Sequence, residues 1–321
     1  MIASNPFIPY CLADERPKLK PMNGKSLLVH IAINLEYWPF DRPMPRGIIP
    51  APHGAPPIPP DIPNYGWVEY GMRCGMPRMM DIIADRKIKA SAFMNAMVVD
   101  VYPSLSDRVL TEGYEIVGHG MFQQTLKQAD DEAKVISETV TKLEAFSGQN
   151  IRAWLGPGLA ETENSLELFR QNGIEFVHDW IVDDLPAWIK AGVDHIVALP
   201  YSLELNDVPV YVIQNASSDE LYKRVEASLS IFDAEIKTKN DCRILTIGLH
   251  PHIIGVPHRA YYFEQILDLL LQRSDTIFVT SSQIGEWFLS QAKIQDGDRC
   301  IIDQDDLRGQ TNVSIARDKG A

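Results

Sequence analysis

The stretch Gly248-Leu249-His250-Pro251-His252 decides how this chain is interpreted, because it joins the apolar run Ile244 to Leu249 to a pair of histidines. Short apolar runs that alternate with helical patterns are typical of strands in a parallel sheet. In α/β enzymes, the residues that carry out the chemistry lie at the carboxyl ends of such strands. We therefore expect His250 and His252 at a functional site.

A second apolar run, Leu27 to Leu35, leads into Glu36. If this run is a strand, Asn34 and Glu36 lie on the same face of it. A carboxylate at the mouth of a barrel can act as a general base, and aromatic neighbours would raise its pKa toward the working range. The alternative is that Glu36 forms a structural ion pair with an arginine such as Arg73.

A third run, Glu115 to Gly118, leads into His119, and glycines flank this histidine on both sides. Glycine allows backbone or substrate to approach closely. Imidazole titrates near neutrality, so His119 and His250 can both take part in proton transfer. The alternatives are that His119 is structural and that one of His250 and His252 caps the following loop. We prefer His250 as the general acid because it is nearer the strand.

The composition excludes several classes of partner. The 321 residues carry a net charge of -13, with 43 acidic and 30 basic residues, so nucleic acid and anionic membrane surfaces are disfavoured. No apolar run approaches the roughly 20 residues of a membrane span, and residues 1–6 lack the pattern of a signal peptide. We expect a cytoplasmic protein with a small-molecule substrate. The four cysteines form no CxxC pair, so a zinc cluster is not indicated.

Alternating strand and helix patterns over residues 26–292 predict an α/β fold, and seven or eight units of this size suit a single barrel. Helical faces are predicted around residues 133–143, closed by Gly148; 221–232, after a capping box from Ser217 to Glu220; 263–271; and 284–288. The predicted strands are Leu27–Asn34, Ala90–Asn95, Glu115–Gly118, Arg152–Leu155, Glu175–His178, His195–Leu199, Arg243–Leu249 and Thr276–Thr280.

The expected boundaries are an N-terminal extension over residues 1–25, one catalytic barrel over 26–293 and a polar C-terminal tail over 294–321. Residues 39–63 hold ten of the 22 prolines, so this segment is expected to be a long extended loop. Because the loop directly follows Glu36, it is expected to lie over the site. Alternatively, this loop lies across another part of the protein surface or contacts a second subunit of an oligomer.

Several motifs in this order resemble the polysaccharide deacetylase superfamily, and most of all its branch with the cofactor-independent allantoinases. They are the strand before Glu36, residues 70–78 (YGMRCGMPR), Gly118-His119-Gly120, residues 183–188 (DDLPAW) and Gly248-Leu249-His250. The resemblance covers about residues 26–290. It implies a distorted (β/α)7 barrel of the polysaccharide deacetylase type, with the NodB-type fold.

Two departures from the family pattern concern a metal. Sugar deacetylases follow the first strand with Asp-Asp, where this chain has Glu36-Tyr37. Their second motif is His-x-x-x-His, where this chain has His119 and Gln123. Glutamine is a poor zinc ligand. The resemblance therefore implies a site without metal or other cofactor. If a metal is retained, its ligands would be Glu36, His119 and Gln123.

The matched positions also suggest substrate contacts. Arg73 could bind an oxygen through a bidentate fork, or form a salt bridge with an acid. Asp184 and Trp188 resemble residues of a substrate loop, with a helix N-cap and a core aromatic as the alternatives. Trp154 suggests a flat substrate pocket, or else fills the barrel. The candidate substrate-binding residues are Asn34, Tyr70, Arg73, Trp154, Asp184, Trp188 and His252.

We interpret the chain as a hydrolase of a C–N bond in a cyclic amide, imide or ureide. Glu36 would deprotonate water, His119 with nearby backbone amides would position the substrate and polarise its carbonyl, and His250 would protonate the leaving nitrogen. The alternatives are a metal-dependent sugar de-N-acetylase and a non-catalytic binding protein on the same fold. Allantoinase-like relatives imply a homo-oligomer.

Overall fold

The computed structural model describes residues 4–47 and 58–292. Their strands form a nine-stranded sheet in the order β6-β7-β5-β4-β3-β2-β1-β8, and β9 also pairs with β1. The strands are β1 (Leu27–Leu35), β2 (Ser91–Met94), β3 (Glu115–Gly118), β4 (Ala153–Trp154), β5 (Phe176–Val177), β6 (Ala187–Ala191), β7 (Asp194–Ala198), β8 (Arg243–Leu249) and β9 (Thr276–Val279).

This sheet curves into an incompletely closed barrel. Seven parallel strands, β1 to β5 with β7 and β8, form its wall. The edge strand β8 meets the segment after β7 through a bridge between Asn206 and Gly248 and a hydrogen bond from Thr246 Oγ1 to the carbonyl of Pro200, at 2.8 Å, rather than through a full ladder of strand pairs. The predicted distorted (β/α)7 barrel is therefore confirmed.

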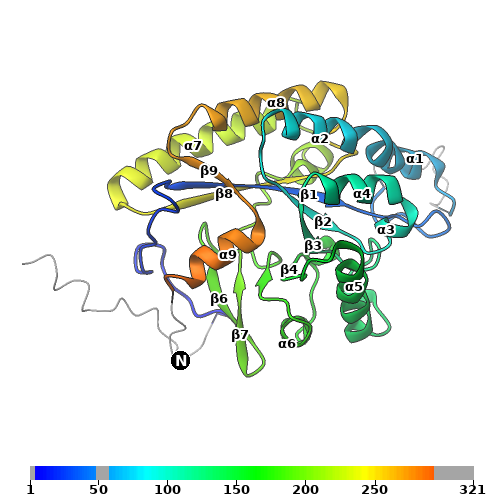
Figure 1. The fold of residues 1–321 in the computed structure, drawn as a ribbon, viewed down its shortest axis with the longest axis horizontal. Helices are drawn as coiled ribbons and strands as arrows, with labels where there is room; N and C mark the ends of the chain where they lie inside the picture. Colours follow the sequence, from blue (N-terminus) through cyan, green and yellow to red (C-terminus); the bar gives the residue numbers. More distant parts are fainter. Residues whose placement is uncertain (1–3, 48–57, 293–321) are drawn as a thin grey trace, which may run out of the picture.

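Helices cover the outside of this barrel, and Figure 1 shows α7, α8 and α2 on one side of β1 and β8. The helices are α1 (Ile62–Tyr70), the π-helix Gly71–Gly75, α2 (Met76–Asp85), α3 (Val98–Val101), α4 (Pro103–Thr111), α5 (Glu132–Ser147), α6 (Ser165–Gln171), the π-helix Val208–Ile213, α7 (Glu220–Lys239), α8 (Pro257–Leu271) and α9 (Ser281–Leu289), with 3-10 turns at Leu126–Gln128 and Pro157–Leu159.

Strand β1 shows how the sequence places the site. All nine of its residues are buried, and its seven hydrophobic residues divide between two cores. Leu27, Val29, Ile31, Ile33 and Leu35 belong to the core under the helices, whereas Leu28 and Ala32 belong to the core inside the barrel. Because successive side chains of a strand alternate between its faces, Asn34 and Glu36 continue the inward-facing series.

Three local predictions need correction. Residues 187–191 form strand β6, antiparallel to β7, where we expected a loop. Helix α7 begins at Glu220 without a side-chain cap, so the predicted capping box from Ser217 does not form. The proline-rich loop ends earlier than residue 63, because Asp61 accepts a hydrogen bond from the backbone of Asn64 and starts α1 at Ile62. Residues 48–57 of that loop, and the tail 294–321, lie outside the described residues.

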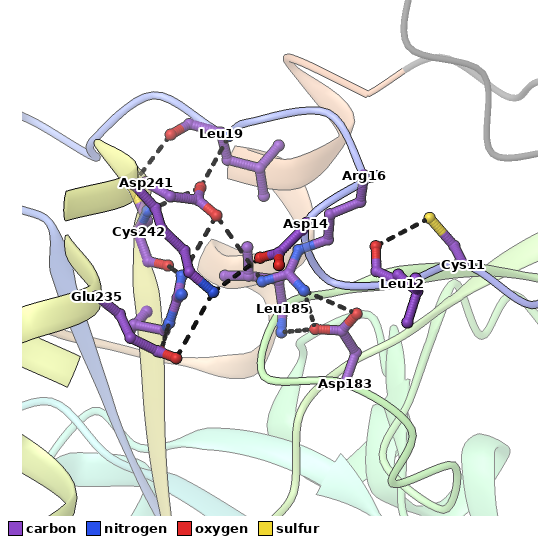
Figure 2. A network of polar contacts seen from close by, with 12 residues as sticks. Cys11, Leu12, Asp14, Arg16, Leu19, Asp183, Leu185, Glu235, Asp241 and Cys242 are labelled. Carbon is purple, nitrogen blue, oxygen red and sulfur yellow. Dashed lines mark hydrogen bonds and ion pairs between the residues drawn. The ribbon is translucent and has the colours of Figure 1, made fainter. Parts of the chain in front are cut away.

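The N-terminal segment before β1 is held by a polar network that Figure 2 shows. Arg16 Nη1 lies 2.8 Å from Asp183, and Arg16 Nη2 lies 3.8 Å from Asp241. The carboxylate of Asp241 also accepts a hydrogen bond from the backbone of Leu19, at 3.2 Å, and pairs with Arg243 at the start of β8. This network lies at the amino end of β8, opposite the end that carries His250.

Candidate active site

Glu36 directly follows β1, and only 5% of its surface is exposed. Its Oε2 accepts a hydrogen bond from Trp38 Nε1 at 2.9 Å, and its Oε1 accepts one from Gln123 Nε2 at 2.8 Å. Burial acts to raise the pKa of Glu36, but His250 and His119 together outweigh it and hold the pKa well below its usual value. The carboxylate is therefore ionised at neutral pH.

His250 lies between two carboxylates at the carboxyl end of β8. Its Nε2 is 3.4 Å from Glu36 Oε1, and its Nδ1 is 2.7 Å from Asp207 Oδ1. The other oxygen of Asp207 accepts the backbone N–H of His250 at 2.7 Å, so Asp207 fixes both the ring and the main chain. Burial acts to lower the pKa of His250, but Asp207 and Glu36 raise it to about 9. His250 is therefore an imidazolium at neutral pH.

His119 also faces the carboxylate, with its Nε2 3.8 Å from Glu36 Oε1. Its Nδ1 lies 2.6 Å from the carbonyl oxygen of Leu155, so in a neutral ring the proton is on Nδ1 and Nε2 is an acceptor. Asn95 Nδ2 donates to the carbonyl of His119 and fixes its backbone. His119 therefore lies beside Glu36, and the polarising role that we expected for it stays a prediction.

His252 is buried next to the site rather than in contact with Glu36. Its ring packs at 4.5 Å from that of Trp67, at 5.7 Å from that of His250 and at 5.8 Å from that of Trp38. Burial, together with the charge of His250, lowers the pKa of His252 to about 3, so it is neutral. His252 can neither donate from a charged ring nor replace His250 as the acid.

The motif at residues 70–78 contributes its glycines rather than its charged side chains. A Cβ on Gly71 would overlap the backbone of His252, and a Cβ on Gly75 would overlap the carbonyl oxygen of Pro251. Both glycines lie in a π-helix, and such turns often occur at functional sites. The close backbone contact holds the loop that carries the two histidines.

Two other predicted residues of this motif make their polar contacts with residues other than Glu36. Arg73 is 74% exposed at its side chain and pairs with Glu69 at 2.7 Å, which is the salt-bridge alternative. The hydroxyl of Tyr70 accepts a long hydrogen bond from Arg78, at 3.4 Å, outside the group of residues around Glu36. The structure therefore gives neither residue a contact with the site.

Trp154, Asp184 and Trp188 also lie outside the site. Trp154 faces α6, where its ring is 5.0 Å from that of Phe169, so it belongs to the outer core. Asp184 is close to Arg16 and Arg243, at the opposite end of the barrel. Trp188 is in β6 and packs against Phe288. The predicted substrate contacts at these three positions are not supported.

Asn34 lies beneath Glu36 and supports the barrel. Its amide donates to Tyr201 Oη at 3.1 Å and to the carbonyl oxygen of Leu249 at 3.2 Å. Tyr201 also accepts a hydrogen bond from Asn206 Nδ2, at 3.1 Å. This network joins β1 to β8 where the barrel is incompletely closed, so Asn34 has a structural role.

Sequence reasoning missed a carboxyl pair that follows β4 and β5. Both oxygens of Asp179 lie 2.9 Å from the backbone N–H of Gly156, and Glu161 Oε2 accepts a hydrogen bond from Trp180 Nε1 at 2.8 Å. Burial, together with the charge of Asp179, raises the pKa of Glu161 to about 9, and burial raises that of Asp179 to about 6. The pair therefore holds at least one proton at neutral pH.

The residues around Glu36 do not fit a metal cage. Gln123 directs its N–H toward the carboxylate. In the sequence, Tyr37 replaces the second acid of the sugar-deacetylase pattern. In the described part of the chain, no group of three or more His, Cys, Asp or Glu side chains could hold a metal ion.

None of the described helices is long and apolar enough to cross a membrane.

Comparisons with known proteins agree with this architecture. Residues 65–177 match the family model "Polysaccharide deacetylase". A chitooligosaccharide deacetylase from Rhizobium leguminosarum bv. trifolii is 30% identical over 129 residues, which cover 37% of this chain and 56% of that protein.

Two solved structures share the fold. A probable polysaccharide deacetylase from Pseudomonas aeruginosa PAO1 has a TM-score of 0.73 at 21% identity, and the match covers 85% of this chain and 94% of the other. The PuuE allantoinase has a TM-score of 0.73 at 20% identity, with 91% and 96% covered. The chain therefore shares the fold of these two structures, and residues 65–177 are similar to the polysaccharide deacetylase family model.

Proposed function

We propose that this protein is a metal-independent hydrolase that opens a small cyclic amide, imide or ureide. One observation carries the proposal: an ionised Glu36 and a protonated His250 face each other at 3.4 Å in a buried site. A carboxylate base and an imidazolium acid are the two groups that hydrolysis of a C–N bond requires. The likeness to an allantoinase structure supports the same reaction class.

The reaction would begin with water between Glu36 and His119. Glu36 accepts one proton while the second O–H donates to His119 Nε2, and the oxygen attacks the carbonyl carbon. The C–N bond then breaks, and His250 gives its Nε2 proton to the departing nitrogen. Transfer of the proton from Glu36 back to His250 restores the resting state, so one water is consumed and no proton is lost.

The low pKa of Glu36 makes it a weak base at the start of the reaction, since proton transfer is most effective when the pKa is near the working pH. The pKa is lowered in this way only while His250 is charged. Once His250 has given its proton to the departing nitrogen, Glu36 holds the proton from water more firmly until it passes that proton to the neutral His250 ring.

A hydrolysis screen tests the proposal. Purified protein is incubated with allantoin, hydantoins, imides and lactams, after chelation and again with added zinc, cobalt or manganese. Ring opening that survives chelation and depends on Glu36 is expected. Activity only on N-acetylated sugars with added metal would instead identify a de-N-acetylase, which the donor set of Glu36, His119 and Gln123 disfavours. No turnover of any compound would favour a binding protein.

A further inference from the structure

Buried polar atoms without a partner gather around Glu36. Among the described residues, His119 Nε2 and Gln123 Oε1 are buried and accept no hydrogen bond, although both side chains face the carboxylate. Native proteins leave few buried polar atoms unsatisfied, so such atoms call for a ligand or water. His119 Nε2 has a place in the reaction as the acceptor for water. The proposed reaction gives no role to Gln123 Oε1.

The orientation of the Gln123 amide is fixed by its neighbours. Its backbone N–H donates to the carbonyl of Tyr37 at 2.9 Å, and its Nε2 donates to Glu36 Oε1 at 2.8 Å. Rotating the amide by half a turn would place its oxygen against an ionised carboxylate, which is unfavourable. Gln123 Oε1 is therefore a preoriented acceptor, and its complement is a hydrogen-bond donor on the ligand.

The base and the acid define where the scissile group must lie. Gln123 Nε2 and His250 Nε2 both face Glu36 Oε1, at 2.8 and 3.4 Å. A scissile amide that receives the proton of His250 on nitrogen therefore lies beside Gln123. A secondary amide carries an N–H on that same nitrogen, and Gln123 Oε1 is an unpaired acceptor on this side of the carboxylate.

We propose that Gln123 is a specificity-determining residue whose Oε1 accepts the N–H of the scissile nitrogen, so that the site takes rings with an unsubstituted N–H and rejects N-alkylated rings. This rests on the proposed ring-opening function. An N-methyl ring would lose the hydrogen bond and leave Gln123 Oε1 buried and unpaired. Such a loss costs about 1–3 kcal/mol, or roughly 5- to 150-fold in kcat/KM.

Matched substrates and a matched variant test the proposal. Succinimide is compared with N-methylsuccinimide, and hydantoin with 3-methylhydantoin, on the wild type, Gln123→Met and Gln124→Met. Methionine keeps the side-chain length but removes the acceptor. The Gln124 side chain makes a solvent-exposed hydrogen bond to the carbonyl of Gln128 at 3.0 Å, so it serves as the control.

We expect the wild type and Gln124→Met to prefer the N–H ring by about 5- to 150-fold. In Gln123→Met, this preference should fall to within about threefold, because only the N–H ring loses a contact. Loss of the Gln123 hydrogen bond to Glu36 slows hydrolysis of both rings alike. The decisive quantity is therefore the ratio of kcat/KM for the N–H ring to kcat/KM for the N-methyl ring. An unchanged ratio in Gln123→Met would show that Gln123 only holds Glu36, and would overturn the proposal.

Measurements of binding distinguish a failure of this specificity proposal from a failure of the proposed ring-opening function. If the wild type hydrolyses none of these rings, the ring-opening function fails for them, and calorimetry then measures their affinity for the intact protein. Tighter binding of the N–H ring that is lost in Gln123→Met would still support the specificity role. Equal affinities, or no measurable binding of either N–H ring, would overturn it.

Discussion

Replacing Asp207 with asparagine is expected to move the alkaline limb of the pH profile to lower pH. Asp207 and Glu36 together raise the pKa of His250 from 6.5 to about 9, and Asp207 makes the shorter contact, 2.7 Å against 3.4 Å. Loss of an adjacent charge shifts a pKa by about one to three units. The His250 acid would therefore lose its proton at a lower pH in Asp207→Asn.

The size of the effect follows from the protonated fraction of His250. With a pKa of about 9, about nine-tenths of His250 is protonated at pH 8. A shift of about two units would leave about a tenth protonated at pH 8 but about nine-tenths at pH 6. The ratio of kcat/KM at pH 8 to that at pH 6 should thus fall about tenfold in Asp207→Asn.

The assay is the pH profile of kcat/KM between pH 5 and 10, together with NMR titration of the His250 ring, which requires no substrate. Asp184→Asn is the control, because Asp184 is an exposed aspartate at the far end of the barrel. An unmoved alkaline limb in Asp207→Asn, or an equal displacement in Asp184→Asn, would refute the reasoning. The raised pKa also adds folding stability that is present below pH 6.5 and lost as the pH rises through about 9.

Three further outcomes are expected. The protein should purify without stoichiometric transition metal and keep its activity in chelators; one equivalent of tightly held zinc, measured by elemental analysis, would contradict this. Glu36→Gln should reduce kcat by roughly a hundredfold to ten-thousandfold while calorimetry still detects substrate binding, and near-normal kcat would place the base elsewhere. His250→Ala should slow a plain lactam far more than an activated imide, because a poor leaving nitrogen needs the acid most, whereas His252→Ala should show a smaller and more uniform loss; equal losses on both substrates would make His250 a positioning residue.

The sequence predicted the barrel and its reactive strand ends because both depend on local patterns. The apolar run before Glu36 and that before His250 are strands as expected, and their parallel pairing brings the two side chains to the same end of the sheet. Gly148 ends α5 in the left-handed conformation, which the sequence also indicated.

What the sequence could not predict depends on contacts between distant segments. Asp207 is 43 residues from His250, and no spacing rule links them. The outward orientation of Trp154 could not be predicted, because β4 has only two residues, too few for alternation to show which face is internal. The glycines at 71 and 75 were visible as a motif, but their role requires knowledge of the loop that packs against them.

The anchoring of the N-terminal segment has a consequence for the order of assembly during synthesis. The backbone of Leu19 bonds to Asp241, 222 residues later, and the carbonyl of Lys20 accepts the indole N–H of Trp287, 267 residues later. Chains emerge from the ribosome N-terminus first, so this segment waits for nearly the whole chain before its partners exist. Its docking is a late step, and pairing of such distant segments is slow. Fixing of the earliest residues therefore marks the completion of the barrel.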